Sequence, residues 1–563
     1  MHPDVRALAE ADLATWLLNR GIELDKGIEG LREQQVEALD WAMQQQAPYL
    51  LINAPTGSGK TLLNGVAGAL MGNTWSYAVH TTMLQDQFVR TFPSVPLIKG
   101  RGNFDCLIGM ETHGREISAA EGICAADQWC EHTGRDSLDG DPAGPMCNYY
   151  AQRSRAMESP FRAANYAMII NQARGGPFVS MLGRGRSNTL LADEAHNIED
   201  IVASQVSFDL QIRTFNRLGV PIPRLGRDLE AWLDWAEGAK DSLPVVPKKR
   251  SATAPDRGLI TAHKALDQLM AIKASEAGKW IIEEKGGNFP AISFYPVWGT
   301  DHVMPWLFGH QDAPESMDVF ARAEAYDPGV KQVVMTSATL IGAEFVAELM
   351  GLPAESWAYL DLPSTFPVKN RPIMYSPVDQ MNAGRMSTLE GRAKMQTAMD
   401  ELIDFYVLNG KAAGVIHSVS NRYRDQILQE SRWGSIMTSS ISEHEGKVRQ
   451  GLPSVLVAAN VTEGWDGADE LCRFILMPKV PFPNLGDERT RLRKEEDQRS
   501  YDFKALVSIV QGSGRGVRHA RDFADTWILD GSWRMLHARA SRNGWLPDAF
   551  TSAYHHAVTR PGS

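Results

Sequence analysis

Ala54-Pro55-Thr56-Gly57-Ser58-Gly59-Lys60-Thr61 lies between an apolar run, Tyr49 to Ile52, and a helix-length segment, Leu62 to Met71. A glycine-rich loop between a strand and a helix is typical of a P-loop, whose backbone N–H groups surround phosphate oxygens at the helix N-terminus. We expect Lys60 to reach the β- and γ-phosphates of ATP and the Thr61 hydroxyl to ligate Mg²⁺. All eight loop residues are therefore candidate nucleotide contacts, although Ala54 replaces the usual first glycine.

Two carboxylates follow the predicted strand Thr189 to Ala192, in the sequence Asp193-Glu194-Ala195-His196. ATP hydrolysis needs one carboxylate on the metal ion and a second beside the attacking water. We assign Asp193 to Mg²⁺ and Glu194 to orienting or deprotonating the water. Taken alone, these residues could equally be an exposed acidic turn, but their place downstream of a P-loop favours nucleotide hydrolysis.

Further candidates for the nucleotide site lie near both ends of the chain. Gln511-Gly512-Ser513-Gly514-Arg515-Gly516-Val517-Arg518 places two arginines three residues apart, on one face of a helix. We expect Gln511, Arg515 and Arg518 to take part in hydrolysis, with the arginines pointing across a cleft at the γ-phosphate; a solvated basic helix is the alternative. Gln35, in Arg32-Glu33-Gln34-Gln35, can read an adenine edge through paired hydrogen bonds, but this signal is weak on its own.

Short apolar runs, each closed by polar or glycine-rich residues, recur along the chain at helix-length intervals. This pattern predicts the buried strands of two parallel α/β sheets. Ligands of such sheets bind beyond the carboxyl ends of the strands. The expected strands are Tyr49–Ile52, Tyr77–Val79, Met168–Ile170, Leu190–Ala192, Val333–Met335, Val415–Ile416, Val455–Val457, Phe474–Met477 and Trp527–Leu529.

The chain of 563 residues is 43% hydrophobic and 22% charged, which is enough for several packed domains. No apolar stretch is long enough to span a membrane and the N-terminus has no signal-peptide pattern, so we expect a cytoplasmic protein. The net charge of −11 argues mildly against nucleic-acid binding but does not exclude a local basic track. We interpret the densest basic run, Arg489, Arg491, Arg493 and Lys494, as a solvated helix face.

Four of the five cysteines are clustered: Cys106, Cys124, Cys130 and Cys147. Four thiolates can bind a [4Fe–4S] cluster or a Zn²⁺ ion. Structural zinc favours closely spaced Cys-x2–4-Cys pairs, which are absent from this cluster. The spacing alone leaves iron–sulfur, zinc and unliganded buried thiols open.

The order of these motifs, together with Ser337-Ala338-Thr339 and Glu463-Gly464-Trp465-Asp466, resembles that of superfamily 2 helicases. Four further stretches resemble the XPD/DinG family of iron–sulfur helicases: Lys99 to Cys106, Cys147 to Tyr150, Ser364 to Pro367 and Pro481 to Pro483. The resemblance covers nearly the whole chain. It implies an α/β fold of two RecA-like parallel-sheet domains, with an iron–sulfur insertion and a helical arch insertion in the first.

This resemblance suggests a division of the chain into domains. The first RecA-like domain takes residues 1–100 with the P-loop, 151–199 with the acidic motif and 326–368 with the Ser-Ala-Thr motif. The iron–sulfur insertion takes 101–150, and the arch, which looks mostly helical, takes 200–325. The second RecA-like domain takes 369–563.

The resemblance also implies roles for individual residues. It implies a [4Fe–4S] cluster on the four clustered cysteines. Glu463 and Asp466 match the motif that links second-lobe DNA contacts to ATP, and Ser337 and Thr339 match the motif that couples hydrolysis to movement. DNA-binding candidates lie where the superfamily touches the DNA backbone or where aromatic rings and arginines flank the cysteines. They are Thr81, Thr82, Arg101, Phe104, Tyr149, Tyr150 and Arg153.

The leading hypothesis is a monomeric ATP-dependent DNA helicase. The resemblance implies 5′ to 3′ movement on single-stranded DNA, with forked DNA, duplexes or R-loops as substrates. One alternative is an accessory translocase that needs a partner in a CRISPR, phage or repair system. Another is a catalytically idle nucleic-acid-binding scaffold, against which the intact motifs argue. Loss of ATP hydrolysis on Lys60→Ala would separate a motor from a scaffold.

Overall fold

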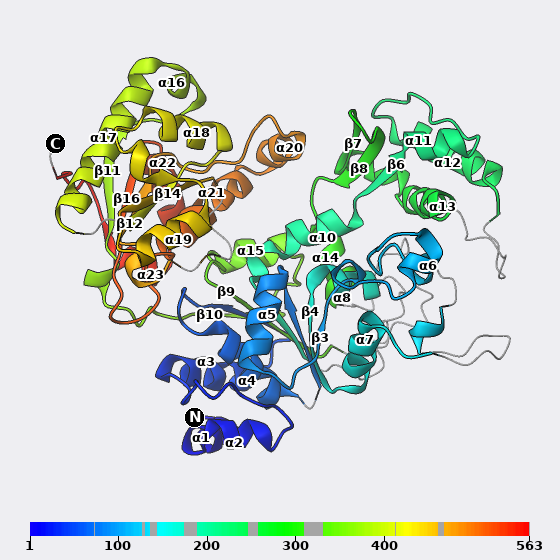
Figure 1. Cartoon of the computed structure of the whole chain (residues 1–563), viewed down its shortest axis with the longest axis horizontal. Helices are drawn as coiled ribbons and strands as arrows, with labels where there is room; N and C mark the ends of the chain where they lie inside the picture. Colours follow the sequence, from blue (N-terminus) through cyan, green and yellow to red (C-terminus); the bar gives the residue numbers. More distant parts are fainter. Residues whose placement is uncertain are drawn as a thin grey trace.

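The computed structural model describes residues 1–72, 74–126, 130–134, 144–173, 189–245, 257–308, 330–410, 413–459, 465 and 467–561. In that part of the chain, two seven-stranded parallel sheets flanked by helices form two lobes, and a three-stranded sheet lies in an insertion (Figure 1). None of the helices in these ranges is long and apolar enough to cross a membrane.

The first lobe has the strand order β10-β1-β9-β5-β2-β4-β3. Its strands are β1 (Tyr49–Asn53), β2 (Trp75–Val79), β3 (Leu97–Ile98), β4 (Phe161–Asn165), β5 (Thr189–Asp193), β9 (Gln332–Ser337) and β10 (Trp357–Asp361). β1, β2 and β5 are buried along their whole length, as expected for apolar strands covered on both faces. β1 and β5 both pair with β9, so the residues that end these three strands lie side by side.

Helices and short helical turns complete this lobe. They are α1 (Pro3–Glu10), α2 (Leu13–Leu18), α3 (Glu33–Gln44), α4 (Lys60–Met71), α5 (Thr82–Thr91), α6 (Gly109–His113), α7 (Asn148–Glu158), α8 (Tyr166–Ala173), α10 (Ile198–Val206), α14 (Thr300–Val303) and α15 (Ala343–Leu349). The expected strand at Met168–Ile170 is wrong, because these residues lie in α8. A short apolar run cannot by itself distinguish a buried strand from the buried side of a helix.

The second lobe has the strand order β13-β14-β12-β15-β16-β11-β17. Its strands are β11 (Ile373–Asp379), β12 (Ala413–His417), β13 (Met437–Thr438), β14 (Ser454–Ala458), β15 (Phe474–Met477), β16 (Asp525–Asp530) and β17 (Tyr554–His555). Its helices are α16 (Ala383–Ser387), α17 (Leu389–Leu408), α18 (Asn421–Glu430), α19 (Ile441–Arg449), α20 (Glu488–Glu496), α21 (Gln498–Ser513), α22 (Trp533–Arg542) and α23 (Asp548–Thr551).

The insertion that follows α10 contains both helices and strands. Its elements are β6 (Phe208–Gln211), α11 (Ile212–Arg217), α12 (Leu229–Ser242), α13 (Arg257–Met270), β7 (Trp280–Lys285) and β8 (Ala291–Pro296). The three strands form an antiparallel sheet, β6-β8-β7, which the expectation of a mostly helical segment did not include. Trp232, Leu266 and Phe294 are buried in a core that this sheet shares with α12 and α13.

The basic run on α20 is not the solvated face that the sequence indicated. Arg493 is buried and Arg489 is largely covered, whereas Arg491 is exposed. The two covered arginines face Glu199 and Asp200 of α10, acidic residues far away in the sequence. Long-range ion pairs therefore use charges that the local pattern would leave in solvent.

Candidate nucleotide site and the second-lobe contacts

The P-loop connects β1 to α4 through two glycines in left-handed backbone conformation. Gly57 has a φ of 80° and Gly59 a φ of 79°, a region that favours glycine. A Cβ atom on Gly57 would lie 2.4 Å from the Phe366 ring, and one on Gly59 would lie 2.4 Å from Gln35 Nε2. The loop therefore needs glycine at both positions for its backbone conformation and for its close packing.

Lys60 begins α4 at the centre of the predicted phosphate site. Its Nζ lies 3.5 Å from the carbonyl oxygen of Ala54 and 3.9 Å from Glu194 Oε1. Thr61 follows on the first turn of the same helix. Hydroxyl and carboxylate oxygens are the ligands that Mg²⁺ prefers, so Thr61 and Asp193 suit this ion.

The Gln35 side chain forms hydrogen bonds with the P-loop backbone. Its side chain is 3% exposed, and Nε2 donates to the carbonyl oxygens of Ser58 and Gly59, each at 3.1 Å. Its Oε1 accepts from the backbone N–H of Arg32 at 2.8 Å. The amide is thus engaged within the protein, and adenine recognition by Gln35 stays a prediction.

Asp193 ends β5 in a buried pocket. Its Oδ2 accepts from the Tyr77 hydroxyl at 2.6 Å, and its Oδ1 accepts from the Thr336 hydroxyl at 3.1 Å. Burial, followed by the neighbouring Glu194 charge, raises the pKa of Asp193. A cation such as Mg²⁺ beside this carboxyl would favour its ionised form.

Glu194 adopts a left-handed backbone with a φ of 50°, which is unusual for a residue with a side chain. Burial opposes its ionisation, but Lys60, His196 and Arg515 together hold the pKa of Glu194 below its ordinary value. The two adjacent carboxyls are therefore pushed in opposite directions. Such a difference suits the distinct roles that the sequence assigns to them, metal binding and water activation.

A hydrogen-bond chain crosses from Glu194 to the second lobe. The Ser337 hydroxyl donates to Glu194 Oε2 at 3.2 Å, and His196 Nδ1 lies 2.7 Å from that hydroxyl. On α21, Gln511 Nε2 lies 2.9 Å from His196 Nε2 and donates to the Thr339 hydroxyl at 3.3 Å. The donors alternate consistently along this chain when His196 carries its proton on Nδ1.

Replacing Gln511 with alanine should lower the turnover of ATP by about 10- to 100-fold, because losing a buried hydrogen-bond partner costs roughly 1–3 kcal/mol. The KM for ATP should change little, since Gln511 does not touch the P-loop. Steady-state phosphate release measures both. Gln429→Ala, which changes an exposed glutamine of the same lobe, is the control. Wild-type turnover in Gln511→Ala would show that this chain does not serve hydrolysis.

Arg515 and Arg518 converge on one backbone carbonyl. Arg515 Nη1 and Arg518 Nη2 donate to the oxygen of Trp465, at 3.2 and 3.1 Å. The end of α21 packs on the P-loop, because a Cβ on Gly514 would lie 2.9 Å from Thr56 Oγ1. The arginines therefore border the phosphate site, and their role as fingers stays a prediction. Glu463 and Asp466 lie outside the described residues.

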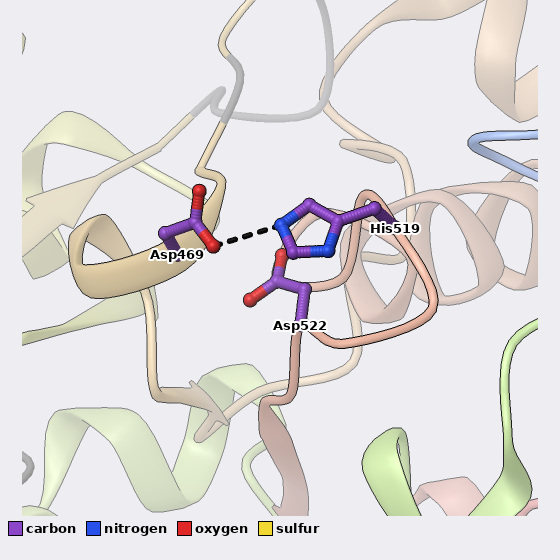
Figure 2. Close-up of side chains that lie close together, drawn as sticks. All are labelled: Asp469, His519 and Asp522. Carbon is purple, nitrogen blue, oxygen red and sulfur yellow. Dashed lines mark hydrogen bonds and ion pairs between the residues drawn. The ribbon is translucent and has the colours of Figure 1, made fainter.

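An acidic and histidine cluster behind these arginines was missed by the sequence reasoning. Figure 2 shows Asp469, His519 and Asp522 close together, with His519 Nε2 2.8 Å from Asp469 Oδ1. Asp522 is already satisfied, since its oxygens accept from Arg473 Nη1 at 2.8 Å and from the backbone N–H of Arg518 at 3.0 Å. The cluster therefore anchors the turn that holds Arg518. In the sequence, the local pattern that could have indicated this cluster was the spacing Arg518-x3-Asp522.

The four clustered cysteines lie together, although not in the geometry of a single zinc ion. A Cβ on Gly122 would lie 3.1 Å from Cys106 Sγ and 3.8 Å from Cys124 Sγ. Among the described residues, no three cysteine sulfurs lie within 4.8 Å of one another, whereas ligands of one tetrahedral Zn²⁺ would be about 3.8 Å apart. Burial raises the pKa of Cys130 to about 11. The thiols of Cys124 and Cys130 are within electrostatic range of the other cysteines of the group, and a [4Fe–4S] cluster on these four residues stays a prediction.

Most DNA-binding candidates near the cysteines pack on one another. Tyr149 is 4% exposed and lies 6.0 Å from Phe104 and 5.1 Å from Tyr150, between ring centroids. Arg101 donates to the carbonyl oxygen of Cys124 at 2.9 Å and stands 5.2 Å above Tyr149. Arg153 is buried and lies 5.7 Å above the Tyr150 ring. Base stacking by Tyr149 would need this group to open.

The two threonines that follow β2 are more accessible. Thr81 caps α5, because its hydroxyl accepts from the backbone N–H of Leu84 at 3.3 Å. Thr82 is exposed at the start of the same helix. Backbone contacts at a helix N-terminus suit phosphate, so these residues stay candidates for the DNA backbone.

The fold and the candidate site define a two-lobed P-loop protein whose candidate nucleotide cleft is built from both lobes. The helicase C-terminal domain family matches residues 407–549, and the DEAD_2 family matches residues 142–215. A solved structure of an XPD helicase has a TM-score of 0.56 with 15% identity, covering 94% of this chain and 100% of that chain. This likeness shows the fold.

Two curated relatives match parts of the chain. The ATP-dependent DNA helicase CHL1 of Saccharomyces cerevisiae is 24% identical over 147 residues, which are 23% of this chain and 17% of that protein. The regulator of telomere elongation helicase 1 homolog of Anopheles gambiae is 22% identical over 267 residues, 40% of this chain and 27% of that protein. The chain thus spans less than a third of the length of these relatives. Together, the family matches, the relatives and the fold support an XPD/DinG-like protein of helicase superfamily 2, as the motifs predict.

Proposed function

We propose that the protein is an ATP-dependent DNA helicase that moves 5′ to 3′ on single-stranded DNA. The observation that carries the motor part of this proposal is the hydrogen-bond chain from Glu194 through Ser337 and His196 to Gln511. The 5′ to 3′ polarity is what the resemblance to the XPD/DinG family implies. It joins the carboxylate assigned to water activation to a helix of the opposite lobe. Hydrolysis that rearranges this chain changes the contact between the lobes, which is what a motor requires.

In this proposal, each residue of the cleft has a defined task. The P-loop amides and Lys60 bind the phosphates, and Glu194 orients the water and accepts its proton. Mg²⁺, held by Thr61 and Asp193, would neutralise charge on the phosphates. Arg515 and Arg518 supply positive charge from the second lobe when the cleft closes around the γ-phosphate.

A cavity of about 1140 Å³ next to this cleft supports a path for a single strand. Its lining includes His196 and Gln511 from the chain above, and the basic residues Lys479 and Lys494. Phe482 and Tyr501, also in the lining, stack with ring centroids 5.1 Å apart and planes 9° apart. Aromatic faces and cations along a groove are what single-stranded nucleic acid binds.

The test uses protein purified without oxygen and two duplexes, one with a 5′ single-stranded tail and one with a 3′ tail. Unwinding of the 5′-tailed duplex alone, dependent on ATP, is expected. Unwinding of the 3′-tailed duplex would overturn the polarity. DNA-stimulated ATP hydrolysis without unwinding of either would point to an accessory translocase that needs a partner. ATP hydrolysis indifferent to DNA would overturn the proposal.

Replacing Cys130 with serine should abolish most of the iron and the unwinding activity while leaving ATP hydrolysis by the two lobes. A buried serine hydroxyl is a poor ligand for iron, and the cysteines lie outside both sheets. Iron content and visible absorbance test the cluster separately from activity. Cys472→Ala, which changes a buried cysteine of the second lobe, is the control. An iron-free wild-type protein that unwinds DNA would contradict the cluster assignment.

A further inference from the structure

A buried group of ion pairs joins three elements beside the nucleotide cleft. The elements are α10, which starts two residues after His196, the segment Val297–Gly299 after β8, and α20, which extends from the second lobe toward the insertion (Figure 1). Arg493 of α20 is the centre: its Nη2 lies 2.5 Å from Glu199 Oε1 and its Nη1 lies 3.0 Å from Asp200 Oδ1. The side chains of Arg493 and Glu199 are only 4% and 7% exposed.

Arg493 also contacts the segment Val297–Gly299, with which the chain leaves the insertion. Its Nε donates to the carbonyl oxygen of Val297 at 2.5 Å, and its guanidinium stands 4.6 Å above the Trp298 ring. Glu199 accepts a hydrogen bond from the backbone N–H of Gly299. One planar, forked side chain thus contacts the helix behind the acidic motif and the end of β8 together, which a lysine cannot do.

The charges of this group are matched across the interface. Lys504 of α21 lies 2.8 Å from Asp200 Oδ2, and Arg489 lies 3.6 Å from Glu199 Oε1. Burial opposes ionisation of Asp200, but Lys504, Arg493 and Arg489 hold the pKa of this carboxyl far below its ordinary value. Buried ion pairs add little net stability compared with apolar packing, but they fix geometry. The desolvation cost of these ion pairs therefore suggests that the relative orientation of α10, α20 and the segment after β8 is important.

This group of ion pairs is connected to the nucleotide site through both lobes. On the first-lobe side, α10 directly follows the motif that contains Glu194 and His196. On the second-lobe side, α21 carries Lys504 in its middle and Gln511 near its end. The helices α10 and α21 therefore each carry one side of the Lys504–Asp200 ion pair and lie next to one end of the hydrogen-bond chain.

We propose that Arg493 is a positioning residue that, through Glu199 and Val297, couples closure of the nucleotide cleft to movement of the insertion formed by β6, β7, β8, α12 and α13. The inference rests on the proposed function, because it names how ATP-driven movement of the lobes reaches the insertion. Arg493 does not touch the nucleotide. Its loss should separate ATP consumption from unwinding and should leave hydrolysis itself in place.

The experiment compares Arg493→Met with Arg491→Met. Arg491 lies on the same helix and is 44% exposed, bound only to Glu488 and Glu495 in the described salt bridges. Hydrogen exchange of peptides from β7 and β8 is measured with and without a non-hydrolysable ATP analogue, and ATP consumed per base pair unwound is measured separately. We expect the nucleotide-dependent change in exchange to persist in wild type and Arg491→Met and to vanish in Arg493→Met. ATP use per base pair should rise several-fold only in Arg493→Met.

Each outcome decides the inference. An unchanged exchange response and unchanged ATP use in Arg493→Met would overturn it, as would a wild-type insertion whose exchange ignores nucleotide. If Arg493→Met does not fold, Glu199→Gln, which removes one charge and keeps the shape, gives the same comparison. Wild-type protein that fails to unwind DNA but shows the exchange response would refute the proposed function. It would not refute the coupling role of Arg493.

Discussion

Replacing Glu194 with glutamine should lower the turnover of ATP by about 100- to 10,000-fold, the range typical of losing a general base. Glutamine keeps the shape of the side chain and can still accept the hydrogen bond from Ser337, but it cannot take a proton from water. The KM for ATP should stay near the wild-type value, because the P-loop and Lys60 are untouched. Phosphate release at saturating ATP and single-stranded DNA measures the effect.

The ionisation state of Glu194 supports the expected loss of turnover. Lys60, His196 and Arg515 lower the pKa of Glu194 despite its burial, which favours the charged carboxylate that an attacking water needs beside it. Glu237→Gln, at an exposed position on α12, removes a carboxylate of the same kind far from the cleft and should leave turnover unchanged. A Glu194→Gln protein with turnover near wild type would place water activation on another residue.

Replacing Asp530 with alanine should lower the free energy of unfolding of the second lobe by about 3 to 5 kcal/mol, because each buried N–H left without its acceptor costs roughly 1–3 kcal/mol. Asp530 is 1% exposed at the end of β16. Its Oδ1 accepts from the backbone N–H groups of Met381 at 2.9 Å and Ser532 at 2.8 Å, and its Oδ2 accepts from that of Val480 at 2.8 Å. One carboxylate thus fastens three loops that line the proposed strand path.

Hydrogen exchange in increasing urea, followed on peptides from β11, β15 and β16, measures this loss in the whole protein. Asp530→Asn should fall between wild type and alanine, since the amide keeps one acceptor but turns an N–H donor toward a loop. Asp425→Ala removes an exposed carboxylate that pairs with Arg424, and it should change the free energy by no more than about 0.5 kcal/mol. Equal stability of Asp530→Ala and Asp425→Ala would show that the loops hold without the carboxylate.

The fold class was predictable because parallel strands leave a strong local signal. Buried strands such as Leu190–Ala192 and Phe474–Met477 are continuous apolar runs closed by polar residues, and the structure confirms them. The three-stranded sheet of the insertion was missed, since β6 alternates buried and half-buried residues over only four positions and β7 shows no alternation. The run Met168–Ile170 was misassigned because a short apolar run does not distinguish a buried strand from the buried side of a helix.

The nucleotide motifs were predictable as residues but not as contacts. Gly57 and Gly59 can be inferred from the loop itself, because a left-handed backbone favours glycine. The use of the Gln35 amide within the P-loop, and the shared Trp465 carbonyl under Arg515 and Arg518, depend on how distant segments meet. Burial and partners of polar groups are set by packing, which a motif does not contain.

The sequence by itself determined the class of fold, the candidate nucleotide motifs and the likeness to XPD/DinG helicases, because these rest on residues that are adjacent or periodic in the chain. Only the tertiary structure decided that Arg493 is buried against Glu199, 294 positions away, and that Gln511 reaches His196 across the cleft, 315 positions away. A local charge pattern predicts solvent around an arginine. The carboxylate that offsets the desolvation cost of that arginine can be identified only when the fold brings two remote helices into contact.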